Sequence, residues 1–364
     1  YNRPSFPLVT DSKAGRMPHD MSQETFGPTG SAGPAGSAGP TGSALSGETR
    51  RVTRAAVLIS LGNITSRVLG LAREMVKSHF FGAGGVVSAF DVAYQVPTMV
   101  YDQLVGGMLN SALVPVFSDY ADAEHQEALW RLLSFLLSML ALLLAILLVV
   151  VEILAPQVTL LLSAGLDPVY LELATQMLRI TAPAIFFLNV AGLLSAALYA
   201  LKRFTYPAFT AALSNATFVF VVVLFGRSQL GVYSLAIGLL LGSAAQVALQ
   251  WPALRDAQLH FVSPLTPHPA LKTIGKLYLP IGLGLIVDQM AVTLSFNIAS
   301  RTGDSGIAWM KLAATLIQFP LGMVVSAVSI AILPTLSRYA NDAAEEQFRF
   351  TLAQGLRLVL ILVL

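Results

Sequence analysis

The stretch LLSFLLSMLALLLAILLVVV, residues 132–151, decides the fold class of this chain. It carries no charged residue over twenty positions. An α-helix of about 20 residues spans the roughly 30 Å of hydrocarbon in a bilayer. Further apolar blocks occupy residues 207–225, 231–249 and 320–333. The sequence therefore predicts an all-α, polytopic membrane protein.

The overall composition of the 364 residues supports a membrane environment. Hydrophobic residues make up 55% of the chain and charged residues 12%, with a mean hydropathy of +0.69. Soluble domains carry roughly 25% charged residues. The net charge of +2 gives no reason to expect a nucleic-acid partner. Because the chain has no cysteine, it forms neither disulfides nor thiolate metal sites.

The apolar segments divide into eight complete predicted spans. These are residues 54–81, 86–117, 132–154, 171–200, 206–225, 231–250, 277–300 and 307–334. A ninth segment begins near residue 351 and reaches Leu364 after about 14 positions, which is too short to cross a bilayer. We therefore expect the chain to stop inside a helix.

Lysine and arginine concentrate on one side of these predicted spans. The N-terminal flank and the even-numbered connections carry Arg50, Arg51, Arg54, Lys202, Arg203, Arg255, Lys272, Lys276, Arg338 and Arg349. The odd-numbered connections carry Arg227 and Arg301, with Lys77 at the edge of the first. Because cytoplasmic loops are enriched in lysine and arginine, the N-terminus is expected to be cytoplasmic.

Residues 1–50 form a segment of a different kind, rich in glycine, proline and serine. Glycine recurs every third position from Gly27 to Gly42, a period that is compatible with a collagen-like trimer or with a flexible tail. Six triplets without hydrophobic flanks favour a disordered cytoplasmic tail. The segment lacks the apolar region of a signal peptide.

An internal repeat suggests two lobes. SALVPVFSDYA at residues 111–121 matches IAILPTLSRYA at 330–340 in five positions, and an even number of predicted spans separates the two copies. Such repeats run parallel to each other in the membrane. We expect a two-lobed bundle with parallel six-helix repeats. Residues 51–260 form the first lobe, and residues 261–364 begin an incomplete second lobe with helices 7, 8 and part of 9.

Charged residues interrupt the first predicted span. Arg67, Arg73 and Glu74 lie within it, and each charge at the centre of a membrane helix costs about 2.5–3.5 kcal/mol. The second span carries Asp91, Gln95 and Asp102 at helical spacing. We expect these two polar stripes to line a water-filled cleft. The alternative is that Arg67 pairs with Asp91 or Asp102 only to hold the two helices together.

No catalytic, metal-binding or cofactor-binding pattern is present in the sequence. The five histidines, at positions 19, 79, 125, 260 and 268, lack the spacing of metal ligands. Neither a phosphate-binding loop nor a catalytic serine, histidine and aspartate set is found. The sequence therefore predicts a protein that is not an enzyme and needs no cofactor.

Several motifs resemble the MviN/MurJ family of lipid II flippases, within the multidrug/oligosaccharidyl-lipid/polysaccharide exporter superfamily. These are SRVLGLARE at 66–74, FFGAGGVVSAFDVAYQVP at 80–97, SALVPVFSDYA at 111–121 and LPIGLGLIVDQM at 279–290. The resemblance covers roughly residues 52–364. It implies alternating access in the bacterial cytoplasmic (inner) membrane, carrying a lipid-linked cell-wall precursor outward. The resemblance also implies arginines that hold the pyrophosphate, and it is compatible with a coupling cation or the membrane potential as the driving force.

The sequence departs from the family pattern inside the expected cavity. Tyr101 and Asp102 replace two arginines, Gly106 replaces a glutamate, and Ala314 and Thr315 replace an aspartate and an arginine. Gln318 and Ser295 also replace acidic residues. Lys311, one helical turn before Thr315, partly restores the charge. The candidate substrate-binding residues are Arg67, Arg73, Glu74, Asp91, Gln95, Asp102 and Lys311.

These departures leave two alternatives to a lipid II flippase. The first is a family member retuned to another lipid-linked glycan or to a cationic substrate, which Asp91, Asp102 and Asp288 would suit. The second is a non-transporting scaffold for assembly of the cell envelope.

Overall fold

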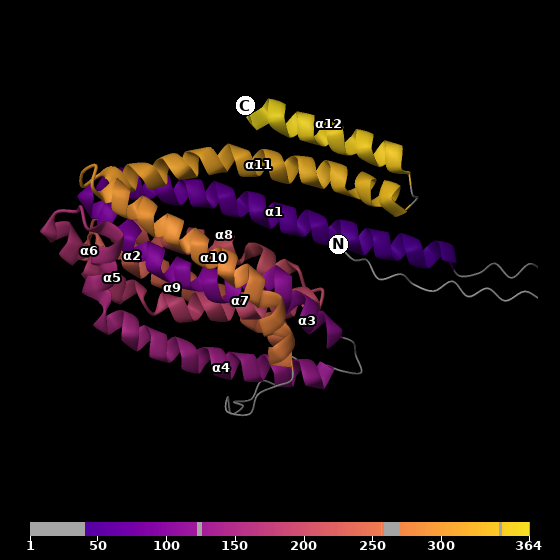
Figure 1. The fold of residues 1–364 in the computed structure, drawn as a ribbon, viewed down its shortest axis with the longest axis horizontal. Coiled ribbons are helices and arrows are strands. Elements are labelled where there is room, and N and C mark those ends of the chain that lie inside the picture. The colour runs from indigo at the N-terminus through magenta and orange to yellow at the C-terminus, as the bar shows by residue number, and fades with distance from the viewer. Residues whose placement is uncertain (1–40, 122–125, 256, 258–269, 342–343, 364) are drawn as a thin grey trace, which may run out of the picture. The chain divides into compact units, whose positions relative to one another are not determined.

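The computed structural model describes residues 41–121, 126–255, 257, 270–341 and 344–363, and within these ranges it contains helices and no strand (Figure 1). Contacts divide the chain into residues Tyr1–Gly47 and Glu48–Leu364. All seven candidate residues lie in the second unit. Most of the expected N-terminal tail, residues 1–40, lies outside the described residues.

All nine expected membrane segments coincide with helices. The elements are α1 (Thr41–Phe81), α2 (Gly85–Tyr101), π-helices η1 (Asp102–Gly106) and η2 (Leu109–Leu113), α3 (Val114–Asp119), α4 (Gln126–Ile153), α5 (Ala155–Ser163), α6 (Pro168–Thr181), α7 (Ala184–Ala200), α8 (Thr205–Phe225), α9 (Tyr233–Gln250), 3-10 helix η3 (Trp251–Leu254), α10 (Ala270–Ser300), α11 (Gly306–Asn341) and α12 (Glu345–Val363). The short helix α5 was not expected. Helix α1 begins at Thr41, before the expected start at residue 54.

Within the described residues, four helices are long and apolar enough to cross a membrane: α4, α8, α10 and α9 with η3. Helices α6 and α7 pass the same test as a pair bent by 45°. The bend lies at Pro183, which caps α7 and has no N–H to donate to the preceding turn. Helices α1 and α11 contain 41 and 36 residues, which is more than the length of a span.

The expected span 86–117 is helical from Gly85 to Asp119, but two stretches in it are π-helices. A π-helix forms i to i+5 hydrogen bonds and therefore turns less per residue than an α-helix. The side chains that follow it in the chain consequently point in other directions than they would on a continuous α-helix. The first stretch begins at Asp102 and is followed by Gly107, where an added Cβ would overlap Leu285 of α10. Leu285 of α10 therefore packs directly against the backbone at Gly107.

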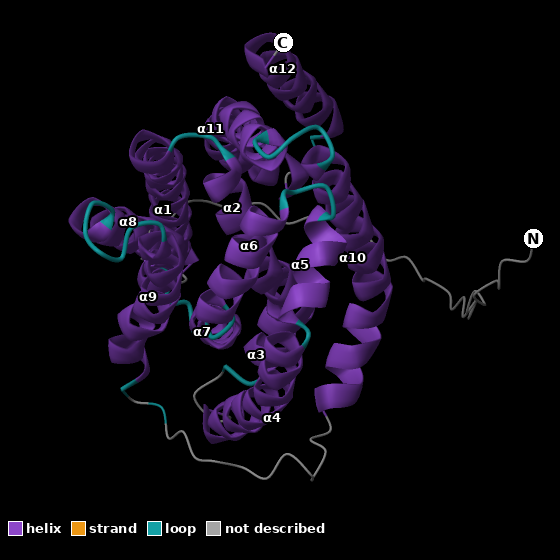
Figure 2. Ribbon diagram, turned by 90° about the vertical axis from the view of Figure 1, so that its left-hand side faces the viewer, coloured by secondary structure: helices purple, strands orange, loops and turns teal. Residues whose placement is uncertain are grey.

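Helix α2 lies in the middle of the bundle, as the end-on view shows (Figure 2). It contacts α6, α7, α9 and α11. Its buried apolar side chains, with those of α4 and α7, form a continuous core that includes Phe90, Leu132 and Leu194. One side of α4 stays exposed at Ile146, Val149 and similar residues, as expected for a helix that faces lipid.

Candidate functional site

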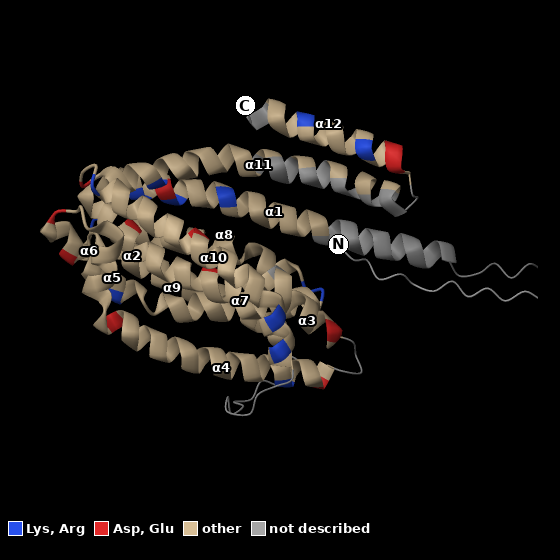
Figure 3. Ribbon diagram, viewed as in Figure 1, with Lys and Arg blue, Asp and Glu red and all other residues tan. Residues whose placement is uncertain are grey.

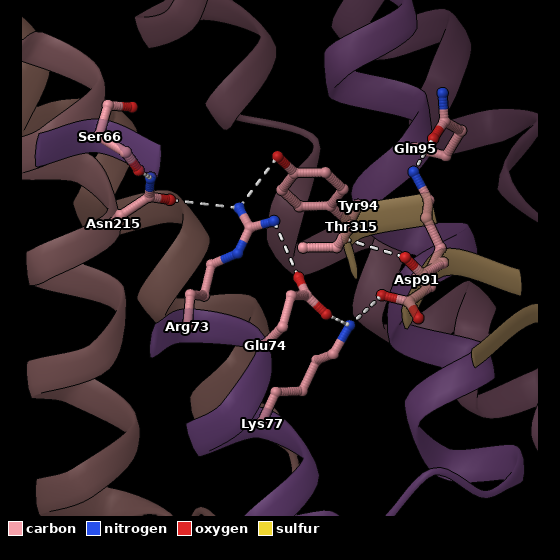
Figure 4. Close-up of polar contacts among 10 residues, drawn as sticks. Ser66, Arg73, Glu74, Lys77, Asp91, Tyr94, Gln95, Asn215 and Thr315 are labelled. Carbon is pink, nitrogen blue, oxygen red and sulfur yellow. Dashed lines mark hydrogen bonds and ion pairs between the residues drawn. The ribbon is translucent and has the colours of Figure 1, made fainter. Parts of the chain in front are cut away.

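Charged residues lie mostly near helix ends, but α1 also carries them along its length (Figure 3). Four of them, from α1 and α2, form one ion-pair network (Figure 4). Arg73 Nη2 lies 3.0 Å from Glu74 Oε1, and Lys77 Nζ lies 2.6 Å from Glu74 Oε2. The same Nζ lies 2.7 Å from Asp91 Oδ1. Two positive and two negative groups therefore balance within the network.

Arg73 connects this network to a third helix. Its Nη1 donates to the Tyr94 hydroxyl at 3.1 Å and to Asn215 Oδ1 of α8 at 3.4 Å. The guanidinium also lies 4.9 Å from the centre of the Tyr94 ring, a cation–π geometry. Asn215 in turn donates from Nδ2 to the Ser66 carbonyl of α1 at 3.2 Å. Polar groups from α1, α2 and α8 therefore fix the position of the guanidinium.

Lys311 brings α11 to the same place. Its Nζ donates to Gln95 Oε1 at 2.8 Å and lies 5.1 and 5.8 Å from the ring centres of Phe296 and Tyr94. These partners are neutral. Among the described residues, no carboxylate forms an ion pair with Lys311.

Arg67 lies apart from the network and reaches α11 instead. Its Nη1 donates to the Gln318 carbonyl at 3.2 Å, which is again a neutral partner. The alternative that Arg67 pairs with Asp91 or Asp102 is therefore wrong. Asp91 is already bound to Lys77, and Asp102 lies elsewhere on the π-helical segment.

Asp102 is exposed and does not join the other candidates. A Cβ built on Gly106 would lie 3.2 Å from Asp102 Oδ1, so the carboxylate rests against this glycine. The structure thus brings together five of the seven candidates, Arg73, Glu74, Asp91, Gln95 and Lys311, while Arg67 and Asp102 lie outside this group.

The expectation that Glu74 and Asp91 line a water-filled cleft is corrected by the structure. Their side chains are 5% and 4% exposed. The reason is Lys77, which sequence reasoning placed at the edge of a connection. It lies one turn after Glu74 on α1 and supplies the countercharge that allows both carboxylates to be buried. The i, i+3 spacing of Glu74 and Lys77 is a signal that could have revealed it.

Burial makes the network costly to disturb. Lys77 is 3% exposed, and Asp91 Oδ2 has no hydrogen-bond partner within the described part of the chain. A buried charge that loses its partner is strongly unfavourable, because neither water nor another group replaces it. The network therefore fixes α1 against α2. Of the three candidate cations, Arg67 and Lys311 have only neutral partners among the described residues, whereas Arg73 also pairs with Glu74.

A helical bundle with several apolar helices of membrane-spanning length and with ionisable side chains joined between its helices is typical of the membrane transporter class. The comparisons with known proteins agree. The family model described as "Lipid II flippase MurJ" matches residues 77–364. The chain belongs to this family.

Curated relatives carry the same description. The chain is 31% identical to the lipid II flippase MurJ of Burkholderia cenocepacia over 317 residues, covering 85% of this chain and 61% of the relative. It is 29% identical to the probable lipid II flippase MurJ of Vibrio cholerae, covering 86% of this chain and 62% of the relative. The chain thus spans about three fifths of the length of these relatives.

Solved structures show the same fold. A lipid II flippase MurJ in an inward closed conformation matches with a TM-score of 0.70 and 24% identity, over 84% of this chain and 63% of that protein. An inward-facing multidrug transporter of the MATE family matches with a TM-score of 0.65 and 16% identity, over 84% and 71%.

Proposed function

We propose that this chain carries out the work of a lipid II flippase, moving a lipid-linked peptidoglycan precursor outward across the cytoplasmic membrane by alternating access. Its membership of the family supports this activity. So does the arrangement of ionisable groups between α1, α2 and α11, because a transporter for a charged headgroup needs polar side chains within the bilayer.

The observation that carries the proposal is the neutral coordination of Lys311. Its Nζ is held by an amide oxygen and two aromatic rings. A phosphate oxygen offers such an ammonium a charge-assisted hydrogen bond, which is shorter and stronger than a bond to a neutral acceptor. Arg73, fixed beside it through Tyr94, adds a planar guanidinium that stays charged at any physiological pH. We assign Lys311 and Arg73 to the pyrophosphate and Arg67 to the path it follows.

The remaining candidates have supporting roles in this proposal. Glu74 and Asp91 hold Lys77 and Arg73 in position, and Gln95 holds Lys311. Asp102 opposes an anionic headgroup and sets one limit of its path.

We further infer that the N-terminus is cytoplasmic, that residues 51–260 and 261–364 belong to two lobes, and that a cation or the membrane potential drives the transport.

Binding of purified lipid II to the chain in lipid nanodiscs tests the proposal. Lys311→Met is expected to weaken binding at least about tenfold, the equivalent of one lost charge-assisted hydrogen bond. Arg131→Ala is the matched control, because Arg131 is exposed and pairs only with Glu127 among described residues. Phosphatidylglycerol serves as the competitor, since it carries a phosphate but neither pyrophosphate nor sugar.

Unchanged lipid II binding by Lys311→Met would contradict the assigned site. The cationic-substrate alternative is favoured by the exposed carboxylate of Asp102. It makes the opposite prediction for Asp102→Asn: this variant would lose binding of the cationic substrate, whereas under the flippase proposal it retains or strengthens binding of lipid II.

A further inference from the structure

The guanidinium of Arg67 occupies space that any side chain at position 322 would need. Gly322 lies on α11, and a Cβ built on it would overlap Nη1, Nη2 and Cζ of Arg67. Its helical neighbour one turn earlier, Gln318, supplies the carbonyl that Arg67 binds at 3.2 Å. The absence of a side chain at Gly322 thus forms a notch in α11 that is filled from α1.

Arg67 makes the furthest along α11 of three hydrogen bonds that join described side chains of α1 and α2 to described residues of α11. The first joins the Ala308 N–H to Ser88 Oγ at 3.2 Å, and the second joins Lys311 to Gln95. Gln318 lies ten residues after Ala308, about 15 Å further along the helix axis.

The three contacts with α11 differ in burial. The hydrogen bond between Ala308 and Ser88 is buried, and the one between Lys311 and Gln95 is partly buried. The Arg67 contact is exposed and joins a charge to one neutral carbonyl, and an arginine side chain has many rotamers available once released. Separation of α1 from α11 can therefore begin at this end while the contacts at Ser88 and Gln95 hold.

We propose that Arg67 is a latch that closes α1 against α11, and that Gly322 is the seat that admits it. The latch is seated in the present structure. Its release lets the helices part from the Gln318 end, with the Ala308 to Ser88 contact as the pivot. This proposal rests on the geometry of the two helices and is independent of the substrate that the protein carries.

Replacement of Gly322 by alanine tests the latch cleanly. The overlapping atoms belong to the far end of a flexible side chain, so a methyl group displaces the guanidinium without moving either helix backbone. Gly284→Ala on α10 is the matched control, because a Cβ there meets nothing within 4 Å. Arg67→Gln removes the latch from the other side and leaves the notch open.

The readout is the distance between α1 and α11. Because the chain has no cysteine, spin labels can be placed at Leu61→Cys and Ile317→Cys, two exposed positions, and measured by pulsed electron paramagnetic resonance in nanodiscs. Gly322→Ala and Arg67→Gln are expected to broaden the distance distribution and shift its mean to longer values, while Gly284→Ala matches the parent.

Two results would overturn the latch. One is a Gly322→Ala distribution that superimposes on the parent. The other is an Arg67→Gln distribution that does so, which remains decisive even where the glycine variant fails to fold. Circular dichroism and gel filtration of each labelled variant establish that the helices are intact before distances are compared.

Discussion

Lys77 of α1 and Asp91 of α2 form an ion pair of 2.7 Å, with 3% and 4% of their side-chain surfaces exposed. Lys77 also binds Glu74, but Asp91 has no second ion-pair partner among the described residues. The pair therefore joins two helices through a single ammonium group. Because Lys77 has a second partner and Asp91 does not, we expect the two substitutions to differ in their cost to stability.

Lys77→Met is expected to destabilise the protein by about 3–5 kcal/mol, because it leaves Asp91 buried without its cation. Asp91→Asn is expected to cost less, since Lys77 keeps Glu74. Unfolding in mixed micelles with increasing denaturing detergent measures both. Arg131→Ala breaks an exposed pair and serves as the control, with an expected change below about 1 kcal/mol. Equal costs for the two buried variants would contradict the asymmetry.

Tyr94 holds Arg73 in two ways that substitutions can separate. Tyr94→Phe removes the hydroxyl that accepts from Arg73 at 3.1 Å but keeps the ring beneath the guanidinium. Tyr94→Leu removes both. We expect lipid II affinity to fall a few-fold in Tyr94→Phe and further in Tyr94→Leu, because a hydrogen bond and a cation–π contact each contribute about 0.5–1.5 kcal/mol. Identical affinities for the two variants would show that the ring plays no part.

Gly165 forms a close contact between the turn before α6 and the end of α10. Its N–H donates to Ser300 Oγ at 3.0 Å, and an added Cβ would lie 2.6 Å from Ser300 and Arg301 backbone atoms. Since backbone cannot move aside as a flexible side chain does, Gly165→Ala is expected to destabilise by about 1–3 kcal/mol. Gly284→Ala, with open space, is expected to be neutral or slightly stabilising in the same unfolding experiment.

The inferred orientation can be measured by labelling with a membrane-impermeant maleimide. Thr302→Cys, in the turn between α10 and α11, is expected to react in intact cells. Lys202→Cys, in the turn between α7 and α8, is expected to react only after the membrane is permeabilised. The chain without cysteine is the blank. The reverse pattern would place the N-terminus outside.

The helical membrane class and the positions of the helices were predictable from the sequence, because long apolar blocks such as 132–151 have one physical solution in a bilayer. The bend at Pro183 was also predictable, since proline lacks the donor that its helix needs. The π-helices at Asp102 and Leu109 were not, because the apolar pattern of this segment does not distinguish i to i+5 turns from i to i+4 turns.

The candidate site was likewise predictable from the sequence only in part. Sequence periodicity placed Glu74 and Asp91 on facing stripes, and the family resemblance singled out Lys311. The burial of both acids, however, followed from a third residue, Lys77. The sequence by itself determined which charges enter the membrane helices, because those charges interrupt apolar runs. Only the tertiary structure decided which of them pair and which stay with neutral partners. Pairing requires atoms of different helices within about 3 Å, and helical spacing fixes a face, not a distance.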